Sequence, residues 1–188
     1  MRVTGGAARG ILLGNGGRED LRPATDRMRQ AVFSSLAADI EGVDCLDLFA
    51  GTGAYGLESL SRGAASARFV EQDRHSVRAI GMNAQAVCKS IGIGTQVCFV
   101  EQRDVFSWVA PAAAFGLVFA DPPYDLLPAR AAEIFGIAAR ALAPGGLFVF
   151  EMPGGLDLTD ARMDLIKILG KGRNAPSVCV FSMKNIRD

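Results

Sequence analysis

Histidine is nearly absent from this sequence, and cysteine is sparse. His75 is the single histidine among 188 residues, which argues against catalytic triads that use histidine and against histidine-rich metal sites. The cysteines lie far apart in apolar surroundings and lack the short paired spacing of zinc ligands. They are Cys45, Cys88, Cys98 and Cys179. We therefore expect buried thiols and no bound metal.

Long hydrophobic runs are also missing. No stretch of about 18 or more apolar residues occurs, and the first six residues do not have the pattern of a signal peptide. Hydrophobic residues make up 49% and charged residues 21%, which is typical of soluble globular proteins. The length fits a single domain over residues 1–188. We expect a cytoplasmic protein with no membrane partner, and a monomer, because no predicted helix has a spare apolar face.

The chain has no net charge, but its charge is unevenly distributed. A formal net charge of zero gives no overall attraction to nucleic acid. Residues 1–30 nevertheless hold an excess of +3, with arginines against three acidic side chains. The arginines are Arg2, Arg9, Arg18, Arg22, Arg27 and Arg29. Such an end can contact phosphates or form a solvated face with ordinary ion pairs, and charge alone leaves both open.

Apolar strands and amphipathic helices alternate along most of the chain. This alternation predicts an α/β fold with a doubly wound, mostly parallel, seven-stranded Rossmann-like sheet. The expected strands are 43–49, 67–71, 95–100, 116–120, 147–151, 163–169 and 177–183, the last two forming an antiparallel hairpin. The expected helices are 54–62, 74–91 and 129–142, with a short helical segment at 104–108 and a stop at the Pro-Gly-Gly of 144–146. An N-terminal β-hairpin at 2–13 and a helix at 26–39, capped by Thr25, make an extension over 1–40.

A strand, a tight turn and a helix meet at residues 46–56. Gly51 and Gly53 let a ligand approach the backbone at the start of the helix. With Gly56 they also satisfy the dinucleotide fingerprint, so the turn alone leaves the ligand open. Asp47 lies four residues before Gly51, where its carboxylate can accept hydrogen bonds from a cationic amino-acid group and would repel a pyrophosphate. This favours S-adenosylmethionine as the cofactor.

Other strand ends supply further candidate contacts to this cofactor. Glu71 ends the second strand, where its carboxylate can bind both ribose hydroxyls, and Gln72 follows it. Asp104 can accept a hydrogen bond from the adenine amino group, while apolar neighbours cover the ring. The cofactor-binding candidates are Asp47, Phe49, Gly51, Gly53, Glu71, Gln72, Asp104 and Val105.

The tetrapeptide Asp-Pro-Pro-Tyr at 121–124 directly follows an apolar strand. A nucleobase amine is a poor nucleophile until its hydrogens are held, and the Asp121 carboxylate and the Pro122 carbonyl can both accept them. Pro122 and Pro123 fix the turn, and Tyr124 can stack on a flipped base. In-line attack on a sulfonium methyl then needs positioning and no metal. The four residues are our catalytic candidates.

With these motifs the chain resembles the class I S-adenosylmethionine-dependent methyltransferases. More closely, it resembles the bacterial family that methylates the exocyclic N2 of a guanine in 16S rRNA. The segments that carry the resemblance are 2–6 with 9–10, 21–29, 47–58, 60–64, 69–71 and 121–124.

The resemblance implies a target-amine site at 121–124 and a cofactor site built on Asp47 and the glycine turn. It also implies that the N-terminal extension faces 16S rRNA within an assembling small ribosomal subunit. The expected RNA contacts are Arg2, Arg9, Arg22, Arg27 and Arg29.

Three other functions remain open at this point. An adenine-N6 methyltransferase acting on DNA or RNA would share the sheet and the tetrapeptide. An NAD-dependent oxidoreductase would use the glycine turn and Glu71, but it leaves the segment 121–124 unexplained. A ribosome-assembly factor without catalysis would keep its biological activity when Asp121 is replaced by alanine.

Overall fold

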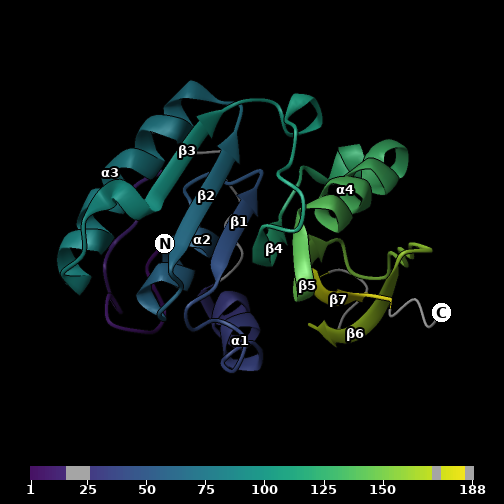
Figure 1. Ribbon diagram of the computed structural model, residues 1–188, viewed down its shortest axis with the longest axis horizontal. Coiled ribbons are helices and arrows are strands. Elements are labelled where there is room, and N and C mark those ends of the chain that lie inside the picture. The colour runs from purple at the N-terminus through teal and green to yellow at the C-terminus, as the bar shows by residue number, and fades with distance from the viewer. Residues whose placement is uncertain (16–25, 171–174, 185–188) are drawn as a thin grey trace.

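The computed structural model describes residues 1–15, 26–170 and 175–184, and Figure 1 shows its ribbon. The strands are β1 Asp44–Leu48, β2 Ser66–Glu71, β3 Cys98–Gln102, β4 Phe115–Ala120, β5 Leu142–Met152, β6 Met163–Leu169 and β7 Ser177–Met183. The helices are α1 Asp26–Ser35, α2 Ala54–Ser61, α3 Arg74–Ile91 and α4 Leu127–Ala141. Short 3-10 turns lie at η1 Thr95–Val97, η2 Val105–Ser107 and η3 Tyr124–Leu126.

All seven strands belong to one sheet. Their order is β3-β2-β1-β4-β5-β7-β6, which can be followed across Figure 1. The strands β1 to β5 pair in parallel, and β7 is antiparallel to both β5 and β6. The predicted doubly wound α/β fold, including its final antiparallel hairpin, is confirmed.

The two faces of the sheet are covered by different helices. Successive strand residues point to opposite faces, so alternate residues of one strand enter different cores. Phe119 packs against Phe33 of α1, with ring centroids 5.6 Å apart, and α2 and α3 cover the same face. Phe148 packs against Phe135 of α4 on the opposite face, with ring centroids 5.5 Å apart. The central strands are therefore buried on both sides, which explains their continuous apolar runs.

The N-terminal segment forms the expected antiparallel pairing, but only as a single bridge between Arg2 and Leu12. Val3 donates its N–H to the Ile11 carbonyl at 2.9 Å. The loop between them docks on the end of α2, where Ser61 accepts N–H groups from two loop residues, through its carbonyl at 2.7 Å and through its Oγ at 2.8 Å. The hairpin is therefore fixed to the body of the protein. The proposed cap Thr25 lies outside the described residues.

Two element boundaries in the first half differ from the prediction. Helix α1 ends at Ser35 rather than near residue 39, because a turn follows that lets Ile40 pack in the core. The third strand does not begin at 95: Thr95–Val97 is a 3-10 turn, and β3 starts where Cys98 comes into register with β2. Pairing with the neighbouring strand sets this boundary, and the apolar pattern alone does not contain it.

The α4–β5 connection also differs. Helix α4 begins at Leu127 rather than 129, because Pro128 fits the first turn of a helix, where its missing N–H costs nothing. No loop separates α4 from β5, which starts at Leu142 and runs through the Pro-Gly-Gly of 144–146. Leu142 pairs with Phe115, and a register shift follows that accommodates these residues.

Candidate functional site

A cavity of about 750 Å³ opens over the carboxyl ends of the parallel strands. Its position is the one where open α/β sheets bind ligands, and its volume suits a nucleoside-sized cofactor. Most of the predicted site residues line it together. They are Asp47, Phe49, Gly51, Glu71, Gln72, Asp104, Val105, Asp121, Pro122, Pro123 and Tyr124.

Gly53 is the exception among the cofactor candidates. It is the N-cap of α2, with φ 78°, and its N–H is bonded to the Ala50 carbonyl at 2.7 Å. A Cβ at this position would lie 3.2 Å from the ring of Phe69. Gly53 is therefore absent from the described cavity wall, and it acts by permitting the left-handed turn and its packing.

Four acidic residues of the site lie on one face of the sheet, in two neighbouring rows. Asp47 is in register with Phe69 of β2 and with Phe119 of β4, and Phe119 pairs with Val149 of β5. Two residues after Phe69, Phe119 and Val149, the same three chain segments each have an acidic residue on the same face. They are Glu71, Asp121 and Glu151. Because the side chains of a strand alternate, these carboxylates project toward the same side as Asp47.

Asp47 is almost completely buried, at 2% exposure, beside the start of α2. Its Oδ2 accepts the Gly56 N–H at 3.0 Å. Burial raises the pKa of this carboxyl to about 8, the Gly56 hydrogen bond opposes the rise, and the charge of Glu71 adds to it. A cationic group entering the cavity would reverse this shift.

Glu71 ties the glycine turn to β2. Its Oε2 accepts the Gly51 N–H at 2.8 Å, and its Oε1 accepts the Asp73 N–H at 2.8 Å. Each carboxylate oxygen has a second lone pair, so both can still accept a hydroxyl of a bound ribose. The carboxylate also holds the turn that it would share with the ligand.

A strained residue stands between β1 and the turn. Phe49 has φ 58°, a left-handed conformation that costs a non-glycine residue energy and that clusters at functional sites. Its ring meets that of Phe106 edge-on, with centroids 5.7 Å apart. Asp104 caps this neighbouring turn by accepting the Phe106 N–H at 3.1 Å, and Val105 is buried beside it. The cavity thus has an apolar end with one carboxylate at its edge.

The tetrapeptide 121–124 also lines the cavity. Burial raises the pKa of Asp121 well above its usual range, and the charges of Glu151 and Asp47 raise it further. Pro122 is buried, whereas Pro123 and Tyr124 are exposed. The next turn continues directly from Pro123, whose carbonyl accepts the Leu126 N–H at 3.1 Å.

Two further residues that line the cavity, Tyr55 and Glu151, were not predicted from the sequence. Glu151 ends the apolar run of β5 as Asp121 ends that of β4, and this signal could have identified it. Its Oε2 accepts the hydroxyl proton of Tyr55 at 2.8 Å. Burial raises the pKa of Glu151, while the Tyr55 hydrogen bond and the positive charge of Arg29 oppose the rise.

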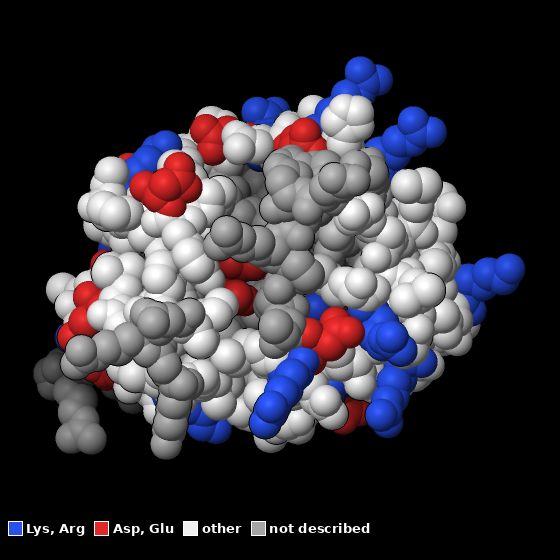
Figure 2. Space-filling model, turned by 180° about the vertical axis from the view of Figure 1, so that it is seen from behind, with Lys and Arg blue, Asp and Glu red and all other residues white. Residues whose placement is uncertain are grey.

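The arginines expected to contact RNA do not share one environment. Arg2, Arg9 and Arg27 are exposed, and Arg22 lies outside the described residues. The prediction that Arg29 faces RNA is wrong for this structure, because its side chain has 0% exposure and is enclosed among Asp26, Glu58 and the Arg2 carbonyl. Figure 2 shows basic side chains scattered among acidic ones on one face of the described surface.

No group of three or more His, Cys, Asp or Glu side chains within 1–15, 26–170 and 175–184 could hold a metal ion. In the same ranges, no helix has the length and apolar character needed to cross a membrane.

Comparison with known proteins adds sequence and structural relatives. A family model described as Conserved hypothetical protein 95 matches residues 1–181. Ribosomal RNA small subunit methyltransferase D of Escherichia coli is 37% identical over 125 residues, covering 66% of this chain and 60% of that protein. The protein of the same name from Haemophilus influenzae is 31% identical over 151 residues, covering 80% of this chain and 78% of its own. The match thus spans less than two thirds of the first relative.

The relationship extends to a solved structure. The structure of yhhF from Escherichia coli superposes on this chain with a TM-score of 0.79 and 28% sequence identity, and the match covers 98% of each chain. The family resemblance carried by the sequence motifs is confirmed.

Proposed function

The chain belongs to the Conserved hypothetical protein 95 family, and from this premise we propose that it transfers a methyl group from S-adenosylmethionine to the exocyclic N2 amine of a guanine in 16S rRNA. One observation carries the proposal. The amine-holding segment 121–124 and the cofactor residues around Asp47 line the same cavity. The names of the Escherichia coli and Haemophilus influenzae relatives support rRNA of the small subunit as the substrate.

The cavity fits the cofactor in its chemistry. Asp47 would accept a hydrogen bond from the α-ammonium group, and Glu71 would accept hydrogen bonds from the ribose hydroxyls. Asp104 would accept a hydrogen bond from the adenine amine, and Phe49 and Val105 would lie beside the adenine ring. When bound, S-adenosylmethionine supplies an electrophilic methyl group on a positively charged sulfur. The buried carboxylates nearby favour this positive charge, and ionisation of Asp47 on binding would strengthen that attraction.

Asp121 and Pro122 would prepare the amine for attack. The Asp121 carboxylate and the Pro122 carbonyl accept the two N2 hydrogens, which moves the nitrogen toward tetrahedral geometry and frees its lone pair. The bound cofactor would supply the methyl group to this lone pair, and its sulfur would keep the electrons of the carbon–sulfur bond. The surplus N2 proton then passes to the Asp121 carboxylate, and Tyr124 stacks on the base throughout.

The position of Glu151 beside Asp121 favours guanine over adenine as the target base. The Watson–Crick edge of guanine places the N1–H donor beside the N2 amine, whereas adenine places the N1 lone pair beside its amine. Glu151 neighbours Asp121 across the β4–β5 register and lines the same cavity. An ionised Glu151 accepts the guanine N1–H and repels the adenine N1.

The test is transfer of labelled methyl from S-adenosylmethionine to small-subunit rRNA from cells that lack this gene, presented as free RNA and as particles. Nucleoside analysis should give N2-methylguanosine. Asp121→Ala should abolish transfer while cofactor binding persists. N6-methyladenosine would move the assignment to the adenine enzyme. Absence of transfer to every substrate form, with biological activity kept in Asp121→Ala, would favour the assembly factor.

A further inference from the structure

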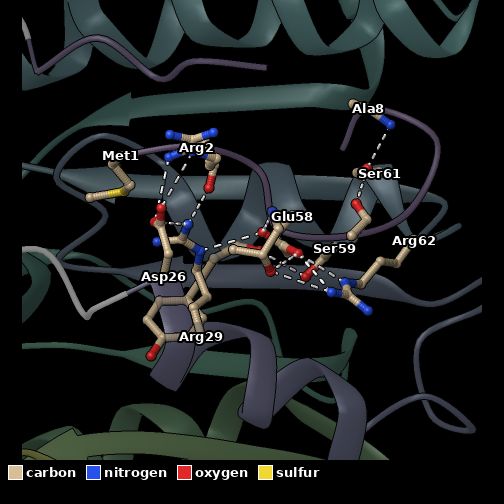
Figure 3. Close-up of polar contacts among 12 residues, drawn as sticks. Met1, Arg2, Ala8, Asp26, Arg29, Glu58, Ser59, Ser61 and Arg62 are labelled. Carbon is tan, nitrogen blue, oxygen red and sulfur yellow. Dashed lines mark hydrogen bonds and ion pairs between the residues drawn. The ribbon is translucent and has the colours of Figure 1, made fainter. Parts of the chain in front are cut away.

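Arg29 is a fully buried cation whose hydrogen bonds are incomplete. Its Nη2 donates to Asp26 Oδ1 at 2.9 Å and to the Arg2 carbonyl, and its Nε donates to Glu58 Oε2 at 3.4 Å. Figure 3 shows these contacts converging on the arginine from the N-terminal segment, α1 and α2. Its Nη1 is buried and has no hydrogen-bond partner in the structure. An unpaired charged donor in the interior is costly, so it suggests a missing acceptor.

The same arginine borders the cofactor cavity. Arg29 is one of the residues that line it, together with Asp47, Tyr55 and Glu151. Burial raises the pKa values of Tyr55 and Glu151, and the positive charge of Arg29 opposes both rises, which places it within electrostatic reach of the cavity wall. The buried donor without a partner therefore belongs to a side chain that borders the ligand space.

The charge of the cavity makes this position unusual. Its described lining includes acids at the ends of five strands or in the loops after them, and Arg29 is the only Lys or Arg in that lining. The amino-acid end of S-adenosylmethionine carries an ammonium and a carboxylate. Asp47 suits the ammonium, but a carboxylate in this acidic surrounding needs a cation, and guanidinium binds carboxylates with strong directional hydrogen bonds.

We propose that Arg29 is the cofactor-carboxylate anchor: Nη1 donates to the α-carboxylate of S-adenosylmethionine while Asp47 accepts from its α-ammonium. This inference rests on the proposed cofactor, and it replaces the expectation that Arg29 contacts RNA. The network around Glu58 holds the guanidinium in place. Glu58 is itself buried and accepts hydrogen bonds from the Thr4 N–H at 2.8 Å and from Arg62 at 2.9 Å.

Arg62 provides a matched control. Both arginines pair with Glu58, but Arg62 is absent from the described cavity lining. Arg29→Gln leaves Glu58 with its Thr4 and Arg62 partners, so its carboxylate stays paired. Arg62→Gln leaves Glu58 with Thr4 and Arg29. A difference between these variants therefore reports the cavity contact and not the loss of an ion pair in general.

The measurement is calorimetric binding of S-adenosylmethionine and of its decarboxylated analogue, which keeps the sulfonium and the ammonium. Wild type and Arg62→Gln should bind the complete cofactor about 10- to 100-fold more tightly than the analogue. In Arg29→Gln this ratio should fall close to one, with affinity for the analogue little changed. Because the comparison is a ratio of two ligands on one protein, partial unfolding of a variant cancels.

Equal affinity of wild type for the two ligands would overturn the proposal, and this result needs no variant to fold. An unchanged ratio of the two ligand affinities in Arg29→Gln would overturn it as well. If that variant bound RNA more weakly and its RNA affinity depended less steeply on salt concentration, Arg29 would be assigned to an RNA phosphate instead. If wild type binds neither ligand, the proposed function fails together with the anchor. If it binds both equally and still methylates rRNA, only the anchor fails.

Discussion

Cofactor binding should release a proton from Asp47. Burial raises the pKa of this carboxyl from 3.8 to about 8, so at pH 7 about nine-tenths of the free protein carries the proton. An α-ammonium group at hydrogen-bond distance favours the ionised carboxylate. Binding of S-adenosylhomocysteine, which has the ammonium but no sulfonium charge, should therefore release about 0.9 proton at pH 7.

Isothermal titration calorimetry in buffers of different ionisation enthalpy measures this number directly. The observed enthalpy at pH 7 should vary linearly with buffer enthalpy, with a slope equal to the protons released. Asp47→Asn removes the titrating group and should reduce the slope to near zero, while also weakening binding. A buffer-independent enthalpy in wild type, or a full release in Asp47→Asn, would refute the assignment of the ammonium to Asp47.

The same shift predicts a pH-dependent stability for the free protein. A carboxyl whose pKa is raised by folding contributes most to stability below its unfolded pKa of 3.8, and this contribution is lost as the pH rises to about 8. Wild type should therefore lose stability relative to Asp47→Asn between pH 5 and pH 8. Urea unfolding of both proteins at the two pH values checks the sign.

Four other substitutions test the packing and the ionisation around the site. Gly56→Ala brings a Cβ within 2.4 Å of the buried Phe69 ring and should lower the free energy of unfolding in urea by about 1–3 kcal/mol. Gly81→Ala, which has open space around it in α3, should raise the same free energy by about 0.5–1 kcal/mol. Glu58→Ala leaves a buried arginine without this carboxylate and should cost about 3–5 kcal/mol by the same assay; a loss below about 1 kcal/mol would contradict the buried ion pair. Tyr55→Phe removes the hydrogen bond that lowers the pKa of Glu151, so the pH of half-maximal methyl transfer should rise; an unchanged profile would exclude Glu151 from the reaction.

The site residues that could be predicted from the sequence are those near the end of a strand or directly after it. Asp47, Glu71 and Asp121 each lie near the carboxyl end of a strand or directly after it, and parallel strands bring these ends to one edge. Glu151 obeys the same rule, because it ends the apolar run of β5, but it was not predicted. Register also explains what failed at β3 and β5, since both begin where a partner strand allows pairing.

The buried arginine could not be predicted in the same way. Arg27 and Arg29 stand two residues apart in one segment, but the first is exposed and the second is enclosed. The difference comes from Glu58, 29 residues away on α2, whose buried carboxylate needs a cation. No local pattern in the sequence contains that pairing, so charge counting assigned both arginines to the surface.

The acidity of the cavity decides what enters it. Phosphates are repelled by the carboxylates of the strand ends, so an RNA backbone should stay outside and present only a base with its amine donors. The cofactor brings its own positive charge, which would lower the pKa values of Asp121 and Glu151 and keep them as acceptors when the base arrives. Cofactor binding should then precede productive base binding. The carboxylate of the cofactor is the one negative group that must enter, and Arg29 is the arginine of the described lining that we propose receives it.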